Sequence, residues 1–558
     1  MKKAVGLILS LILILSMFAA CAGNGANSES SAPDSQESAP PADSSPAEET
    51  ASESEASAGT AADFAYPMDT DVTLTYFTIY NRTSETHEDY AETEYAKSLA
   101  ARTGVEVKYI TGTTEQFNIM AASNDTSDIL EFPFTISYPG GALKAIADGV
   151  IVPLNDLAEH SPNLNKLLAE NPECDKQVKT DDGVYFTFPF FRGDPALQTF
   201  QGPIIRQDWL DDLGLESPTT VDELEAVLTA FKDEKGATAP LSLLSSATSN
   251  GLPFLYQLIG GAYEIGWSAN PNFFIDSADT VVFAPLTPNY KDFLAKLNNW
   301  YVKGLLDSSY GAIDQAALDS NMLNGISGVS VHNAGGGIGR WMDAKADDPS
   351  FQLAGFQQAS MSEGTTPYTG QMENVFPGTT SASISTSCKN PDIAARWLDY
   401  GYSEEGHMFM NFGDEGVAYE LVDGYPKYTD TVTKGEAGLA QTMAIYFRSN
   451  GGGQFVQDLR YLEQYMHRES QLNAVKLWAE TDAEKHVIPP LSFTEEESSR
   501  LAKLTNDINI LVDEKTTKYI IGAESLDSYE DFVSQLEDLG IRECLDIYAA
   551  AYQRYKAR

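Results

Sequence analysis

Residues 72–109 indicate the fold class most clearly, with VTLTYF at 72–77, ETEYAKSLAAR at 92–102 and VEVKY at 105–109. The first piece is a short run of β-prone residues, and the third alternates as a strand does. The middle piece has helical spacing, and Gly104 after it supplies a helix stop. Because strand, helix and strand in this order form a βαβ unit, we predict a parallel sheet with helices on both faces.

The rest of the chain continues this pattern of strands and helices. DIL at 128–130, VSV at 329–331 and ASI at 382–384 are further buried-strand signals, while 391–402 and 458–479 are predicted to be helices. Residues 66–558 exceed the size of one ordinary hydrophobic core. The sequence therefore predicts an α/β protein with two lobes.

The N-terminus is predicted to be an export signal that is not part of the fold. Lys2 and Lys3 precede an apolar run from Ala4 to Ala20, which is too short and wrongly flanked for a permanent membrane span. The run ends in MFAAC at 17–21, which resembles the lipobox of bacterial lipoproteins, although Phe18 replaces the usual Leu. This resemblance predicts a diacylglycerol anchor on Cys21, with palmitate. The alternative is an ordinary secretory signal with an incidental cysteine.

A tether is predicted to follow the anchor. Residues 26–62 contain no aromatic residue, no Val, Ile, Leu or Met, and no Lys or Arg. A segment of this composition cannot bury enough surface to offset its ordering entropy. We therefore predict a disordered acidic linker of Ser, Ala, Pro and Glu at 22–65.

Charge and the absence of motifs exclude several classes of function. The 558 residues include 81 acidic and 36 basic side chains, for a formal charge of −45, so we predict no nucleic-acid partner and no binding to an anionic membrane surface. No Gly-Lys pair of a P-loop occurs, and the six histidines stand far apart. GGGIG at 335–339 lacks the dinucleotide-loop spacing. Cys174, Cys388 and Cys544 are predicted to be small buried hydrophobes. We expect no catalytic site, metal or cofactor.

Paired carboxylates such as Glu404-Glu405 and Glu495-Glu496-Glu497 stand where helices are predicted to begin. Acidic side chains in a first turn favour the helix dipole, and we prefer this interpretation to a glycosidase acid/base pair.

Several segments in order resemble one family: DGVYFTFPF at 182–190, IIRQDWLDDLGLESPTT at 204–220, KNPDIAARWLDYGYSEEG at 389–406, NFGDEGVAYELVDGYPKYTD at 411–430 and LDIYAAAYQRY at 545–555. They are similar to the large lipoprotein branch of family 1 extracellular solute-binding proteins, the ligand receptors of carbohydrate ABC importers. The resemblance covers 66–558. It implies the two-lobed, periplasmic-binding-protein-like (type II) fold, with a hinge between the lobes and the ligand in the cleft between them.

On this basis the chain is expected to divide into a signal and lipobox at 1–21, the tether at 22–65, a first lobe at 66–190 with a return at 361–430, a second lobe at 191–360, and a C-terminal helical part at 431–558 packed mainly on the second lobe. Trp209, Trp300 and Trp397 stand at helical positions and are expected to be scaffold.

Sugar rings need aromatic planes for stacking and polar side chains for their hydroxyls. Loops that follow predicted strands or crossings offer such residues. The candidate ligand-binding residues are Tyr80, Asn81, Glu131, Phe132, Arg192, Trp267, Asn333, Arg340, Trp341, Tyr368 and Glu373. We expect Trp341, which closes a run of glycines, to be partly exposed in the empty cleft.

The predicted function is that of a lipid-anchored receptor, expected to be a monomer, on the outer face of the cytoplasmic membrane. It would capture a carbohydrate, in our interpretation an oligosaccharide, and deliver it to the transmembrane subunits of an ABC permease. Two alternatives stay open. A peptide-binding receptor of similar architecture could use Arg82, Arg192, Arg206 and Arg340 for an acidic ligand, and a secreted polysaccharide-degrading enzyme would also need a signal, aromatics and carboxylates.

Overall fold

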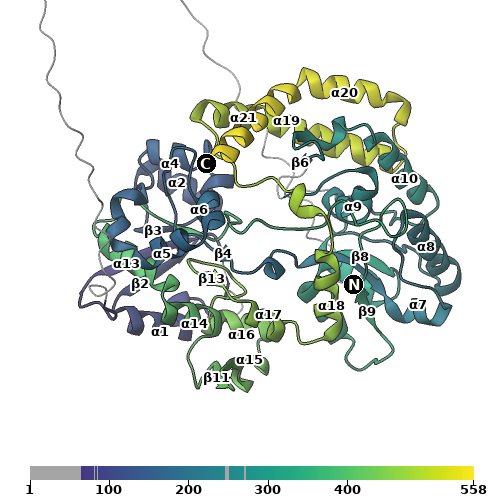
Figure 1. Cartoon of the computed structure of the whole chain (residues 1–558). Coiled ribbons are helices and arrows are strands. Elements are labelled where there is room, and N and C mark those ends of the chain that lie inside the picture. Colours follow the sequence, from purple (N-terminus) through teal and green to yellow (C-terminus); the bar gives the residue numbers. More distant parts are fainter. Residues whose placement is uncertain (1–64, 81, 84–85, 246–250, 269–271) are drawn as a thin grey trace, which may run out of the picture. The chain divides into compact units, whose positions relative to one another are not determined.

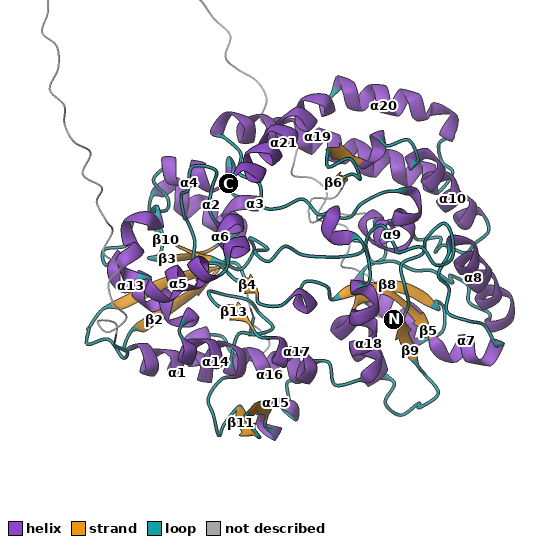
Figure 2. Cartoon of the chain, viewed as in Figure 1, coloured by secondary structure: helices purple, strands orange, loops and turns teal. Residues whose placement is uncertain are grey.

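The computed structural model describes residues 65–558 except 81, 84–85, 246–250 and 269–271, and these residues belong to one compact unit, 58–558. The two sheets with more than two strands lie apart within this unit, each covered by helices (Figure 1). We call each sheet with its helices a lobe. The mixed α/β class predicted from the sequence is confirmed (Figure 2).

The first lobe contains the βαβ unit that the sequence predicts. Its sheet has the order β10-β3-β1-β2, from β1 (Thr73–Thr78), β2 (Glu106–Thr111), β3 (Ile129–Glu131) and β10 (Ala382–Ile384). β1 pairs in parallel with β2 and β3, with Thr73 opposite Glu106, while β10 pairs antiparallel with β3. Gly104 ends α1 (Glu94–Thr103) at φ 75°, a left-handed conformation that favours glycine.

Helices cover both faces of this sheet and bury an aromatic core. Phe117, Phe132 and Trp397 are among its members, and Trp397 is scaffold as predicted. The predicted helix at 391–402 is present as α13 followed by a 3-10 turn over Tyr400–Tyr402. The helices of this lobe are α1, α2 (Thr114–Ser123), α3 (Phe134–Ser137), α4 (Gly141–Ala147), α5 (Pro162–Glu170), α6 (Pro172–Val178), α13 (Pro391–Asp399) and α14 (Glu404–Phe412).

The second lobe has a three-stranded sheet of order β8-β5-β9, formed by β5 (Gln201–Arg206), β8 (Val329–Asn333) and β9 (Leu353–Gly355). Both of its strand pairs are antiparallel, so a parallel sheet is the wrong prediction for this lobe. The reason is the path of the chain. β5 leaves the crossing between the lobes, whereas β8 returns to it, so that Gln201 at the start of β5 pairs with Asn333 at the end of β8.

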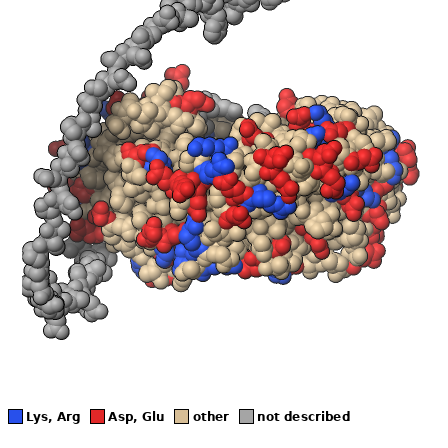
Figure 3. Space-filling model, turned by 90° about the horizontal axis from the view of Figure 1, so that it is seen from above, with Lys and Arg blue, Asp and Glu red and all other residues tan. Residues whose placement is uncertain are grey.

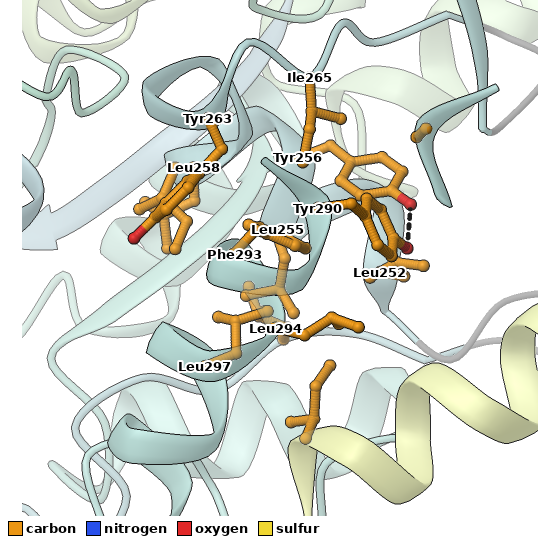
Figure 4. Packing of buried hydrophobic residues seen from close by; sticks show 14 of the residues in the cluster. Leu252, Leu255, Tyr256, Leu258, Tyr263, Ile265, Tyr290, Phe293, Leu294 and Leu297 are labelled. Carbon is orange, nitrogen blue, oxygen red and sulfur yellow. Dashed lines mark hydrogen bonds between the residues drawn. The ribbon is translucent and has the colours of Figure 1, made fainter. Parts of the chain in front are cut away.

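The largest hydrophobic core lies in the second lobe and extends to the C-terminal helices. Trp209 and Trp300 are buried in it, as predicted, and the Tyr256 and Tyr290 hydroxyls meet at 2.7 Å (Figure 4). The helices of this core are α7 (Gln207–Leu213), α8 (Val221–Lys235), α9 (Leu252–Ile259), α10 (Tyr290–Val302), α19 (Glu495–Ile520), α20 (Tyr529–Asp538) and α21 (Ile541–Ala557). The hairpin of β6 (Phe273–Ile275) and β7 (Val281–Phe283) packs there too. Cys544 is buried as predicted, but Cys174 and Cys388 are only half-buried.

Helix starts follow the local chemistry of the sequence. Thr220 and Glu223 form a reciprocal capping box at the start of α8, and the acidic residues at 404–405 and 495–497 begin α14 and α19 as predicted.

A third core joins the β8-β5-β9 sheet to the segment after α14. It includes the hairpin of β11 (Tyr419–Val422) and β12 (Tyr425–Tyr428), and α11 (Gln315–Leu323), α12 (Arg340–Ala344), α15 (Asp430–Thr433), α16 (Leu439–Tyr446), α17 (Leu459–Tyr465) and α18 (Glu469–Ala479). The single helix predicted at 458–479 is therefore wrong. Met466 leaves helical geometry, and the Gln471 side chain accepts from the Arg468 backbone N–H, which starts a new helix. Among the described residues, we find no helix with the length and apolar character that crossing a membrane requires.

Candidate functional site

Strands cross between the lobes at β4 (Phe191–Arg192) and β13 (Val456–Gln457), which pair in parallel. The Arg192 backbone N–H donates to the Val375 carbonyl at 2.9 Å, so the return segment lies against the same crossing. β1, β3 and β8 all end toward this region: Arg82, four residues beyond β1, donates to the Gly451 carbonyl, and Asn333 ends β8 beside Gln201. In open α/β sheets ligands bind outside the carboxyl ends of strands, so this is where a ligand site is expected.

A hollow of about 320 Å³ lies at the end of β8 beside the crossing, and we call it the strand-end hollow. Three aromatic side chains line it, those of Phe200, Tyr461 and Tyr465. Two amides, Asn333 and Asn450, and the Arg192 guanidinium supply its polar side chains together with Thr199; the remaining lining residues are Ala196, Leu197, Gly335, Gly336, Leu462 and Met466. Rings beside amides suit a ligand with apolar faces and a hydroxyl rim.

Arg192 is held in place by neighbours on every side. Its Nε and Nη2 donate to Glu373 Oε2 at 2.9 and 2.7 Å, and its Nη1 donates to Gln457 Oε1 at 2.8 Å. The guanidinium also lies 5.2 Å from the centroid of the Phe190 ring and 5.1 Å from that of Phe200. Arg192 therefore links the crossing strands and carries one wall of the hollow.

The glycine run after β8 packs closely against its surroundings. A Cβ on Gly335 would lie 2.7 Å from the Tyr465 ring, and one on Gly337 would lie 2.7 Å from Ile204. Gln471 on α18 donates to the Ala334 carbonyl at 3.1 Å. Glycine thus allows α17 and α18 to approach the end of β8, which brings Tyr465 to the hollow.

A buried ion triad supports the loop beside the hollow. Glu131 is fully buried and accepts from Arg82 at 2.7 Å and Arg448 at 2.9 Å. Both arginines also donate to loop carbonyls, Arg82 to Gly451 and Arg448 to Gly452. Burial by itself would raise the pKa of Glu131, but the two guanidinium groups outweigh it and hold that pKa below its usual range. Glu131 is thus a buried carboxylate that holds the two arginines supporting the loop at 451–452.

A larger hollow of about 1170 Å³ lies beside the same crossing, and we call it the crossing hollow. Asp194, Pro195 and Gln198 line it, whereas the intervening Ala196 and Leu197 line the strand-end hollow, so the segment 194–198 lies between the two. Its other walls come from α6, the turn after β6, residues 482–489 and the end of α21.

The side chains in the crossing hollow are largely engaged with each other. The Tyr368 ring stacks on His486 with centroids 3.7 Å apart, and burial lowers the pKa of His486. Lys176 lies 4.7 Å from the centroid of the Tyr555 ring. Arg554 and Arg558 from the C-terminal segment both pair with Asp181 of the first lobe.

Three of the predicted site residues are buried in the protein interior. Trp341 is 1% exposed and its Nε1 donates to Asp319 at 2.8 Å, so it is a core residue and not a partly exposed one. Phe132 is also in the core, stacked on Phe117 with centroids 3.8 Å apart. Glu131 is fully buried with its oxygens taken up by two arginines.

The other predicted residues are divided between several places. Arg192 lines both hollows, Asn333 lines the strand-end hollow, and Tyr368 and Glu373 line the crossing hollow. The remaining three that the structure describes line neither hollow: Tyr80 is half-buried beside Arg82, Trp267 packs against the second-lobe core, and Arg340 is exposed and pairs with Asp319. Asn81 and Cys21 lie outside the described residues. Ligand contact by any of them stays a prediction.

The aromatic and amide residues of the strand-end hollow that were not predicted are Phe200, Asn450, Tyr461 and Tyr465. Tyr461 and Tyr465 stand at i and i+4 on α17, a spacing that usually marks a helix face turned to the core. No sequence pattern marked Asn450 as a site residue. Within the described ranges, no group of three or more His, Cys, Asp or Glu side chains is arranged to hold a metal ion.

Comparison with known proteins gives a consistent result. A model of the bacterial extracellular solute-binding protein family matches residues 83–408. The fructooligosaccharide ABC transporter substrate-binding protein FusA of Streptococcus pneumoniae is 23% identical over 523 residues, which is 88% of this chain and 92% of that protein. Lipoprotein LipO of Bacillus subtilis is 23% identical over 489 residues, 82% of this chain and 89% of its own length. The crystal structure of the alginate-binding protein AlgQ2 without calcium ion superimposes with a TM-score of 0.71 at 22% identity, covering 87% of this chain and 99% of that one.

Proposed function

We propose that this chain, which belongs to the bacterial extracellular solute-binding proteins, is a receptor that binds an oligosaccharide in the strand-end hollow and delivers it to an ABC permease. The family match and the two-lobed fold establish the class of protein. The name of FusA, a fructooligosaccharide-binding relative, supports a carbohydrate ligand.

The observation that carries the proposal is the lining of the strand-end hollow. Phe200, Tyr461 and Tyr465 present rings, and Asn333 and Asn450 present amides, where β8 ends beside the crossing. A sugar ring can stack its C–H face on an aromatic plane while amides donate to and accept from its hydroxyls.

Binding and release follow from a hinge between two lobes. The crossings at β4, β13 and Val375 join the lobes, and a ligand that contacts both lobes at once favours the arrangement in which they close around it. ATP hydrolysis would belong to another subunit of the transporter, and the chain itself is proposed to have no enzymatic activity.

Anchoring is a second part of the proposal. Cys21 ends the predicted export signal, and the relative LipO is a lipoprotein by name. We propose that diacylglycerol on Cys21 holds the receptor, as a monomer, at the outer face of the cytoplasmic membrane. Residues 22–65 would then give the binding unit its reach.

A matched pair of tyrosine variants tests where the ligand binds. Tyr465 lines the strand-end hollow and Tyr368 lines the crossing hollow, and both rings are half-buried. A panel of oligosaccharides and peptides is first screened by thermal shift, because a ligand that binds only the folded state raises the melting temperature. Calorimetric titration then measures the affinity of the hits.

We expect Tyr465→Ala to weaken oligosaccharide binding about tenfold to a hundredfold, since losing one stacked ring costs on the order of 1.5 to 3 kcal/mol. Tyr368→Ala should leave the affinity unchanged. The opposite pattern would move the site to the crossing hollow. Binding of peptides alone, or new reducing ends released from glycans, would contradict the proposed function.

A further inference from the structure

The charged groups around the strand-end hollow are all satisfied by the protein itself. Arg192, the one charged side chain among the described residues lining it, donates from Nε and Nη2 to Glu373 and from Nη1 to Gln457. These bonds occupy the two edges that a guanidinium uses to hold a carboxylate in bidentate fashion. An acidic ligand would have to displace Glu373 or Gln457 to gain the same contact.

The two arginines of the buried triad are equally committed. Arg82 donates from Nη1 and Nη2 to Glu131 and from Nε and Nη2 to the Gly451 carbonyl. Arg448 is 2% exposed and donates to Glu131 and to the Gly452 carbonyl. Breaking such a buried ionic network is costly because it leaves an uncompensated charge in a low-dielectric environment. The triad is therefore closed to a ligand carboxylate.

The groups that remain in the hollow are neutral and can both donate and accept. Tyr461 and Tyr465 carry hydroxyls, and Asn450 carries an amide. The buried Thr199 hydroxyl already donates to the Gln371 carbonyl at 3.0 Å, so it can only accept from a ligand. Asn333 accepts from Gln201 Nε2 at 2.7 Å through its side-chain oxygen, which leaves its NH₂ group as a donor. Such a set suits hydroxyl groups and offers no counter-charge.

The net negative charge of the chain also disfavours acidic ligands. Its formal charge is −45, and acidic side chains are spread over the face seen in Figure 3. A strongly negative protein disfavours the approach of anions at low ionic strength. An acidic sugar would need a local cluster of free cations to overcome this repulsion.

We infer that the strand-end hollow selects uncharged oligosaccharides and rejects uronic acid oligomers and peptide carboxylates, with Glu373 as the positioning residue that keeps Arg192 from binding an anion. This inference rests on the proposed function. The relatives named above show that the choice is a real one, since FusA is named for a neutral sugar and AlgQ2 for alginate, a polymer of uronic acids.

Glu373 can be tested separately from the folding of the site. It lines the crossing hollow and not the strand-end hollow, and its backbone N–H donates to the Gln198 carbonyl at 2.9 Å. Glu373→Gln keeps the shape of the side chain but removes the negative charge facing Arg192. The matched control is Glu530→Gln on α20, which changes the net charge equally at an exposed position in another part of the chain.

The experiment uses the chain from residue 22 onward and two sets of probes. One set contains neutral fructo-, malto-, xylo- and manno-oligosaccharides, and the other contains oligogalacturonates and alginate oligomers. Trigalacturonate is supplied both as the free acid and as the methyl ester, a pair that differs in charge and not in sugar or linkage. Affinities are measured by calorimetric titration at low and high salt.

We expect the native chain to bind one or more neutral probes, with an affinity that salt hardly changes, and to bind no acidic probe. Glu373→Gln should gain at least tenfold in affinity for the free acid relative to the native chain, and that gain should disappear at high salt, while Glu530→Gln should show no gain. If Glu373→Gln does not fold, the salt dependence and the acid and ester pair on the native chain still decide the question.

Tight binding of acidic probes by the native chain would overturn the inference and leave the proposed function intact. A native affinity for its best probe that falls steeply with salt would overturn it in the same way. Binding of no sugar of either set would overturn the proposed function, and the inference with it.

Discussion

The variant Trp341→Ala tests whether Trp341, in the region after β8, belongs to the hydrophobic core or to the ligand site. The Trp341 ring is 1% exposed, lies edge-on to His332 with centroids 5.3 Å apart, and donates from Nε1 to Asp319 at 2.8 Å. Burial of the His332 ring in the same region lowers its pKa to about 4. Removing a buried tryptophan side chain costs roughly 3 to 5 kcal/mol in free energy of unfolding, because a cavity remains.

Part of this cost comes from the hydrogen bond to Asp319. Asp319 keeps its other donors, Arg340 and Gln315, so it stays partly satisfied when the indole N–H is lost. Trp341→Phe keeps most of the ring and loses that N–H, and hydrogen bonds to charged groups contribute about 1.5 to 3 kcal/mol. We therefore expect the Phe variant to lose about half as much stability as the Ala variant.

Urea unfolding followed by circular dichroism gives the stabilities, and calorimetric titration with the best neutral probe gives the affinities. We expect both variants to bind within about threefold of the native chain below their unfolding transitions, since that ratio corresponds to only about 0.6 kcal/mol. An Ala variant that is as stable as the native chain but binds tenfold more weakly would refute the core assignment. Trp341 would then return to the ligand site.

Four other predictions follow from the same structure. Gly335→Ala would place a methyl group 2.7 Å from the Tyr465 ring, so it should displace that ring. Titration should then show weaker sugar binding, while the melting temperature changes little. Burial raises the pKa of Asp399 to about 6 despite hydrogen bonds from Asn163 and Leu164, so the free energy of unfolding of the native chain should fall by on the order of 2 to 3 kcal/mol as pH rises from about 4 to 7. Asp399→Asn should remove this fall in urea titrations, and it should be less stable than the native chain at pH 4 because its NH₂ group would face donors that the carboxylate accepts from. Cys21→Ser should release the protein from the membrane fraction, and a variant that resists salt washing would contradict the lipid anchor. Deleting residues 26–62 should leave affinity and melting temperature nearly unchanged, because that stretch has no apolar group to dock; a loss of several degrees would show that it packs on the binding unit.

Features that depend on neighbours in the chain could be predicted from the sequence. The strand, helix and Gly104 stop of the βαβ unit are present where the spacing placed them, because period and helix ends are set within a few residues. The Thr220 cap of α8 follows the same rule. The path of the chain through the second lobe could not be read in this way, since the direction of β5 depends on its departure from the crossing.

The candidate site depends on contacts between distant residues, and only the tertiary structure decides these. Glu131 pairs with Arg82 and with Arg448, which is 317 residues away, and this pairing turns a predicted ligand contact into a buried support. Trp341 is buried because Asp319 and the third core surround it, although its glycine-rich neighbourhood indicated an open loop. Tyr465 has the spacing of a core residue, yet the close approach of α17 to the glycine run brings it to the hollow. Burial and charge pairing are properties of the folded surroundings, and a residue's own sequence neighbours do not contain that information.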